Sequence, residues 1–291
     1  MRFFRRGGAQ LARIDGLDPR ADCVEIARLS YRYEFPFDHQ RATELALVRT
    51  FAIPSISRIL VQSGEFIART QKRFDDTEIL LTNLVEKGFE HPDGKLVIRK
   101  MNRMHRRFDI DNDDYLYVLS TFVAEPVRWN RRHGYRPMSR NEIEGLFHFW
   151  REVGRRMAID QLPATAEEML EWNDAYEREN MVYAEENRAV CEPVLDALLA
   201  KVPHALRPRA HQLVLSTFDD RLLDALGYLR PPARLRALAS AAIRARNRVD
   251  ARLPHREPRL MSDVPRPSYP EGFELQDVGA DRHGAFDSRD P

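Results

Sequence analysis

The spacing of apolar residues along the chain predicts a protein built from α-helices. Apolar positions recur every three to four residues in many windows, and no window alternates apolar and polar residues between turn dipeptides as a half-buried strand would. Helices are expected over residues 22–31, 38–60, 65–87, 95–108, 115–132, 143–157, 166–187, 193–201, 208–218 and 232–252. The predicted fold class is therefore all-α, in a single globular domain.

Local signals predict where several of these helices begin or end. Ser139 and Thr165 are each followed three residues later by a glutamate, which is the pattern of a capping box. Pro54 must begin or break a helix because proline lacks the amide donor. Gly88 is suited to end the helix over residues 65–87, since glycine readily adopts the backbone conformations found after a helix.

Composition divides the chain into three parts. Residues 1–21 form an N-terminal extension, residues 22–252 the helical domain, and residues 253–291 a tail that holds five of the 18 prolines between positions 254 and 270. Few apolar residues in the tail can be packed, so we expect an irregular segment that lies on the body of the protein and is partly disordered.

Charge, cysteine content and hydropathy narrow the class of protein. Lys and Arg number 46 against 45 Asp and Glu, and this net charge of +1 argues against a dedicated nucleic-acid-binding protein. Two cysteines exclude a disulfide scaffold and a cysteine-rich metal site. No segment approaches the roughly 18 apolar residues of a membrane span, and no signal peptide is evident, so a cytoplasmic protein without a transmembrane segment is expected. Arginines at helical spacing over residues 230–252 could contact a membrane surface or nucleic acid, or could be solvated opposite a packed face.

Among the nine histidines, His105 is a candidate ligand. His39 and His133 lie in polar contexts and are expected to be exposed to solvent, whereas His105 follows Met101 by one helical turn and shares its apolar face. A buried neutral imidazole on such a face can bind haem iron. The alternative is a core histidine that is hydrogen-bonded to a backbone carbonyl.

Arg73 and Thr77 form a second candidate site. They are separated by one helical turn and precede an apolar run that begins at Ile79. An arginine and a threonine so placed can bind a propionate or position dioxygen through hydrogen bonds. The alternative is a solvated helix face on which Arg73 pairs with Asp76.

The order of motifs from about residue 25 to residue 252 resembles the catalytic domain shared by MpaB-type oxygenases and rubber oxygenases (latex-clearing proteins). The resemblance rests on Arg73-x-x-x-Thr77, Met104-His105, Tyr115-Leu-Tyr-Val-Leu-Ser-Thr-Phe122, Pro137-Met-Ser, Trp150-Arg-Glu-Val-Gly-Arg-Arg-Met-Ala-Ile159 and Leu162-Pro-Ala-Thr165.

The resemblance implies an all-helical, globin-like core around one haem b, and an oxidoreductase that uses dioxygen on a carbon–carbon double bond. His105 matches the proximal ligand of the haem iron, and Arg73 and Thr77 match residues of the distal helix. Rubber oxygenases act on polyisoprene, and the fungal namesake is associated with the oxidative shortening of a prenyl chain. The family therefore implies a small apolar substrate together with dioxygen.

Two departures from the family pattern bear on the substrate. Asp76 stands where rubber oxygenases carry a lysine before the threonine. The glutamate proposed as their base has no clear counterpart, because Glu65 is the nearest carboxylate while Ser57 lies closer to the expected spacing. No N-terminal membrane anchor like that of the namesake is expected from these residues. We therefore expect a prenyl or terpenoid alkene smaller than rubber, and the alternative is a non-catalytic helical protein that binds haem or a lipid.

Overall fold

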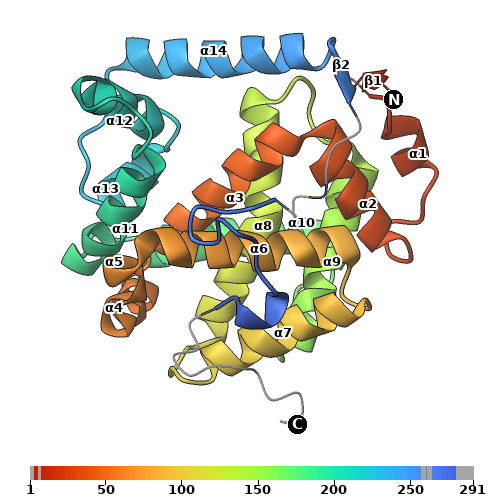
Figure 1. Ribbon diagram of the computed structural model, residues 1–291, viewed down its shortest axis with the longest axis horizontal. Helices are drawn as coiled ribbons and strands as arrows, with labels where there is room; N and C mark the ends of the chain where they lie inside the picture. Colours follow the sequence, from red (N-terminus) through yellow and green to blue (C-terminus); the bar gives the residue numbers. More distant parts are fainter. Residues whose placement is uncertain (1–2, 6–7, 257–259, 261–263, 280–291) are drawn as a thin grey trace.

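The computed structural model describes residues 3–5, 8–256, 260 and 264–279, and α-helices dominate this part of the chain (Figure 1). The helices are α1 (Leu11–Asp15), α2 (Cys23–Leu29), α3 (Pro36–Thr50), α4 (Pro54–Ser63), α5 (Glu65–Ala68), α6 (Thr70–Lys87), α7 (Pro92–His105), α8 (Asn112–His133), α9 (Arg140–Arg156), α10 (Ala166–Asn180), α11 (Glu185–Leu198), α12 (Arg207–Leu215), α13 (Asp220–Ala225) and α14 (Ala233–Asp250). A π-helix, η1 (Ser30–Glu34), and two 3₁₀ turns, η2 (His204–Leu206) and η4 (Leu275–Asp277), complete the helical elements. The predicted all-α class is confirmed. A sheet that the pattern did not predict consists of β1 (Phe3–Arg5) and β2 (Pro254–Arg256), which pair antiparallel.

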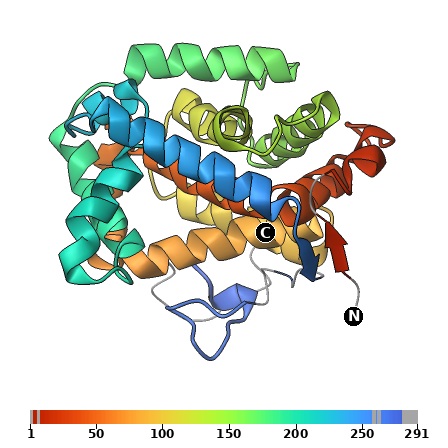
Figure 2. The ribbon, with the colours of Figure 1, turned by 90° about the horizontal axis from the view of Figure 1, so that it is seen from above.

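Helix α8 is the central element of the fold. It packs against α3, α9, α10 and α14. Figure 2 views the molecule approximately along the axis of α8, with other helices around it. One cluster of buried apolar residues is formed by α2 and α6 to α9, and a second by α3 to α5 with α11 to α13. Leu119 of α8 belongs to the first cluster and Tyr117 to the second, because successive residues of a helix point to different sides. Residues from both clusters meet around the cavity described below.

The helix boundaries follow the predicted caps at several positions. The Ser139 hydroxyl accepts a hydrogen bond from the Glu142 amide, and the Glu142 carboxylate accepts one from the Ser139 amide, so the capping box is complete. Thr165 likewise accepts from the amide three residues on, which begins α10. Pro54 occupies the first turn of α4, and Gly88, with a φ of +82°, ends α6.

Tertiary packing breaks two of the predicted helices. The helix expected over residues 65–87 is divided at Arg69, whose φ of −138° and ψ of 44° separate α5 from α6. This bend lets Phe66 of α5 enter the second core cluster, where its ring meets Phe51 edge-on. The helix expected over residues 166–187 ends at Asn180, and α11 begins at Glu185 and continues through Pro193. Periodicity alone did not reveal either break, because the apolar spacing continues across it.

The C-terminal segment over residues 264–279 packs on the outer sides of α6 and α7 (Figures 1 and 2). Val278 is buried in the first core cluster, and Tyr269 packs against the same cluster. The Ser268 amide donates to Asp75 of α6, and Lys100 of α7 donates to the Gln276 carbonyl. The segment therefore lies on the body of the protein, while residues 257–259, 261–263 and 280–291 of the predicted tail fall outside the described residues.

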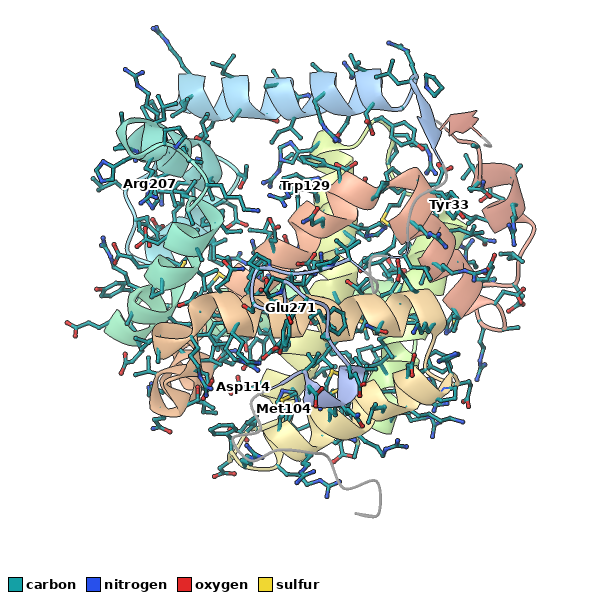
Figure 3. All side chains as sticks on the ribbon, viewed as in Figure 1. Tyr33, Met104, Asp114, Trp129, Arg207 and Glu271 are labelled. Atoms are coloured by element: carbon teal, nitrogen blue, oxygen red, sulfur yellow. The ribbon has the colours of Figure 1, made fainter. Side chains whose placement is uncertain are left out.

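Helix α14, the predicted basic helix, crosses one edge of the molecule (Figure 1). Its Asn247 amide group donates to Asp38 (2.6 Å), which also accepts from the Trp129 indole beneath the helix (Figure 3). At its N-terminal end Arg236 pairs with Asp220 (2.5 Å). The helix is thus held through a few polar contacts. In the described part of the chain no helix is both long and apolar enough to span a bilayer.

Candidate active site

A cavity of about 790 Å³ lies between α6, α7 and α8. Helices α4 and α5 and the Trp150 side of α9 complete its walls, and most of the lining side chains are apolar. Figure 3 labels Met104 and Asp114, which both line this cavity. Its volume lies within the range of small-molecule and cofactor sites.

His105 is the last residue of α7 and lines the cavity. Its ring is edge-on to Tyr115, with the ring centres 5.5 Å apart. Burial, and after it the positive charge of Arg73, lower the pKa of His105 to about 4, while the nearby Met101 carbonyl opposes the change. Nδ1 is buried without a hydrogen bond of good geometry. The imidazole is therefore neutral at physiological pH, which is the form that binds a metal.

Arg73 and Thr77 reach the same cavity from α6. The Arg73 guanidinium stacks over the Phe66 ring at 5.4 Å, and its Nε is buried without a hydrogen bond. Burial lowers its pKa, and the carboxylates of Asp76 and Glu65 offset this only in part. The Thr77 hydroxyl donates to the Arg73 carbonyl (2.8 Å), so its oxygen is left as an acceptor beside the guanidinium.

The structure thus brings His105, Arg73 and Thr77 to one cavity, although α6 and α7 are separated in sequence by a turn. The solvated face considered for Arg73 is not observed. Asp76 pairs with Lys72 (2.9 Å) instead, and Arg73 has no ion-pair partner within the described residues. Arg73 is partly buried, and a cation withdrawn from water without a counter-ion is costly, so its position at the cavity wall points to an anionic or hydrogen-bonding ligand.

Asp76 faces away from the cavity. It accepts hydrogen bonds from Lys72 and from the Tyr269 hydroxyl (2.5 Å), and it is only 1% exposed. Its role is therefore to hold the C-terminal segment against α6. Ser57 is also outside the cavity wall, since its hydroxyl donates to the Phe51 carbonyl.

Two carboxylates line the cavity. Glu65, the carboxylate noted in the sequence, forms an ion pair with Arg69 at the wall. Asp114, which the sequence did not indicate as a site residue, lines the cavity and accepts from the hydroxyls of Ser55 (2.9 Å) and Tyr176 (2.5 Å). Its partners come from α4 and α10, so no local pattern reveals its place.

Trp150 was also missed as a cavity residue. It lies on α9, is 2% exposed, and stacks on Phe122 with the ring centres 4.6 Å apart. The aromatic run around Trp150 predicted a packed helix, and only the crossing of α9 over α8 turns this ring toward the cavity.

Two histidines that were expected in solvent are buried. His39 stacks on Tyr31 at 3.7 Å and shares a hydrogen bond with the Ser30 hydroxyl, and burial lowers its pKa to about 3. His133 is 2% exposed beneath α14, and burial together with Arg132 lowers its pKa to about 4. His133 was mispredicted because the helix that covers it is remote in sequence, whereas His39 is covered by Tyr31 and Ser30 of the neighbouring π-helix, which the apolar spacing did not reveal.

Comparison with known proteins yields one family. The family described as "ER-bound oxygenase mpaB/B'/Rubber oxygenase, catalytic domain" matches residues 43–247. The chain is 29% identical over 226 residues to ER-bound oxygenase mpaB of Penicillium roqueforti (strain FM164), which covers 72% of this chain and 76% of that protein. It is also 29% identical over 240 residues to ER-bound oxygenase mpaB' of Penicillium brevicompactum, which covers 76% of this chain and 56% of the relative. The chain therefore spans about half the length of the second relative.

Proposed function

This chain belongs to the family that unites the catalytic domains of the ER-bound oxygenases mpaB and mpaB' and of the rubber oxygenases, and we propose that it is a haem b-dependent oxygenase acting with dioxygen on an apolar alkene. The resemblance predicted from the motifs is confirmed by the family match. The observation that carries the proposal is the cavity itself, in which a neutral His105 and an unpaired Arg73 line one apolar space.

The residues present fit a haem. His105 would hold the haem iron through its neutral imidazole, and Arg73 would offer a partly buried positive charge to a propionate. The aromatic and aliphatic walls suit a flat apolar macrocycle. When bound, haem supplies the iron at which dioxygen is activated, while the protein binds, orients and excludes water.

The remaining cavity residues define what the chain does for the substrate. Leu81 and Phe122 form apolar walls that hold an alkene and exclude water from it. The Thr77 hydroxyl oxygen and the Arg73 guanidinium add one acceptor and one charge beside this space. These groups orient an oxygen-bearing species relative to the double bond through hydrogen bonds.

Absorption spectroscopy tests the cofactor. The chain, purified after expression with adequate haem, is expected to show a Soret band, and His105→Ala is expected to lose most of the bound haem. His204→Ala, at an exposed position in η2, serves as the matched control and should retain it. A full haem complement with an unchanged spectrum in His105→Ala would refute the ligand assignment.

Measurements of turnover distinguish the two roles considered for Arg73 and Thr77. A screen of prenyl and terpenoid alkenes, read out as carbonyl products and oxygen consumption, provides the assay. If Arg73 and Thr77 act on the reacting groups, Ala at either position lowers turnover far more than haem content, by about tenfold for each 1.4 kcal/mol of lost transition-state stabilisation. If Arg73 binds a propionate, Arg73→Ala releases haem and Thr77→Ala does not. Bound haem with no turnover on any alkene would favour the non-catalytic haem-binding alternative.

A further inference from the structure

A second, smaller chamber adjoins the cavity. It measures about 300 Å³ and lies between α3, the end of α2 with η1, and α6. Five side chains line both spaces and form their common wall: Leu47, Thr77, Leu81, Phe122 and Trp150. The chamber and the cavity are therefore neighbours, so one ligand that spans this wall would occupy both.

Two hydrogen-bonding groups in the chamber lack partners. Tyr31 Oη and Trp150 Nε1 are both buried, and neither makes a hydrogen bond of good geometry. Burial raises the pKa of Tyr31, and the nearby Thr43 hydroxyl and Trp150 indole both oppose this change, so the two rings present their polar groups to the same part of the chamber. A buried donor without an acceptor destabilises the folded protein, and a bound acceptor oxygen would remove that cost.

Stacking holds both rings in place. Tyr31 lies parallel to His39, with an interplanar angle of 9°, and Trp150 lies nearly parallel to Phe122, at 19°. His39 is in turn fixed by its hydrogen bond with Ser30 (2.8 Å). The two donors are therefore preorganised, which reduces the entropic cost of binding.

The charges around the chamber disfavour an anionic ligand. Three glutamates, Glu44, Glu78 and Glu86, line it against two arginines, Arg28 and Arg32. Arg28 is paired with Glu25, whereas Glu44 and Glu78 are paired with Arg41 and Arg266. Burial raises the pKa of Glu44 to about 7, and Glu78 adds to the rise while Arg41 opposes it. A carboxylate or phosphate would meet further negative charge here, whereas a neutral oxygen would not.

We propose that the chamber binds the neutral, hydrogen-bond-accepting head group, such as a ketone or ester, of a substrate whose apolar chain lies in the cavity. Tyr31 Oη and Trp150 Nε1 donate to that oxygen, and Phe74 and Leu81 contact the first carbons of the chain. The proposal rests on the proposed function in one respect, which is that the reacting double bond lies beside His105. It adds the substrate class, an alkene bearing a neutral oxygen at one end.

Calorimetric titration tests this without requiring turnover. The probes are geranylacetone, a ketone with an isoprenoid chain, and the hydrocarbon in which its C=O is replaced by C=CH₂. Both are titrated into the purified full chain and into Tyr31→Phe, Trp150→Phe and the double variant. Each single variant is expected to weaken ketone binding by about 2- to 10-fold relative to hydrocarbon binding, the loss of one hydrogen bond. Tyr183→Phe and Trp172→Phe, which remove the same groups outside both spaces, should leave the ratio of the two dissociation constants unchanged.

The outcomes are distinguishable. A ratio in the double variant equal to that of the unmodified chain would overturn the proposal, as would equal weakening of both probes. A changed ratio in a protein that never oxidises an alkene would support the chamber and contradict the proposed function. A haem-containing, active enzyme with an unchanged ratio would support the proposed function and contradict the binding of a head group in the chamber.

Discussion

Two groups of buried charge in this protein are treated in opposite ways. Between α3, α8, α10 and α13, Arg49 donates through Nε and Nη2 to Glu177 (2.7 and 2.6 Å) and through Nη1 to Asp219 (2.6 Å). Arg128 joins the network by donating to Glu125 (2.8 Å) and to Glu177. Every charge in this network, called here the Arg49 network, meets an opposite one.

The cavity shows the contrary arrangement. Arg73 and His105 are both partly buried, their pKa values are lowered mainly by burial, and the buried atoms Arg73 Nε and His105 Nδ1 make no hydrogen bond of good geometry. Polar groups without partners, such as these two, raise the free energy of the folded state. In the Arg49 network, by contrast, the ion pairs offset the cost of removing the charges from water. The comparison teaches that paired buried charges serve the fold, and that unpaired ones indicate where a ligand belongs.

The largest effect is expected from breaking the Arg49 network. Arg49→Met leaves Glu177 and Asp219 without their main partner, and should lower the free energy of unfolding by about 3–5 kcal/mol. Urea denaturation measures this, with Arg155→Met as a control on an exposed helix face. A loss below about 1 kcal/mol would mean that the two groups of charge do not differ as argued.

The next effect is a pH dependence carried by His105. Its pKa is about 4 in the folded state against 6.5 in the unfolded chain. Above pH 6.5 the imidazole is neutral in both states, so the free energy of unfolding does not depend on its protonation there. As the pH falls from 6.5 to 4, only the unfolded chain takes up the proton, and the free energy of unfolding falls by up to about 1.4 kcal/mol per unit. His105→Leu should flatten this part of the stability profile in the haem-free protein, while His39 and His133 maintain a residual slope of the same sign. An unchanged profile would show that His105 is not buried.

A smaller loss of stability is expected from removing Asp76, which lies on the side of α6 that faces the C-terminal segment. Asp76→Ala removes the acceptor of Lys72 and of Tyr269, and should lower the free energy of unfolding by about 1–3 kcal/mol. Limited proteolysis should then cut residues 264–279 faster than in the unmodified chain. Asp160→Ala, at an exposed position, is the control. Equal cleavage rates would show that the segment is held by its apolar contacts alone.

The smallest change in stability is expected at Arg73. Arg73→Met removes a partly buried cation that has no ion pair among the described residues and keeps an apolar stem near Phe66, so the haem-free protein should lose less than about 1 kcal/mol or become more stable. Haem content or turnover should nevertheless fall, which no surface arginine would produce. A large loss of stability would place Arg73 with the Arg49 network.

Local signals account for the parts of this molecule that could be predicted from sequence. The helical period, Pro54, Gly88 and the Ser139 capping box act within a few residues, and each begins or ends a helix where predicted. His105 was placed on an apolar helix face by its spacing from Met101 alone, and it lines the cavity for that reason. The motif order was sufficient for the family, since the matched region lies within the predicted domain.

Contacts between remote residues decided the rest. Asp76 forms a hydrogen bond with Tyr269, which lies 193 residues away, on the side of α6 that faces away from the cavity. Arg73, on the cavity side, is therefore left without this carboxylate as an ion-pair partner. Asp114 and Trp150 reach the cavity only because α8 crosses α4, α9 and α10. Sequence patterning determines which side of a helix is apolar. Which partner then meets each polar group depends on how the helices pack, and this decides whether a buried charge is paired or left open for a ligand.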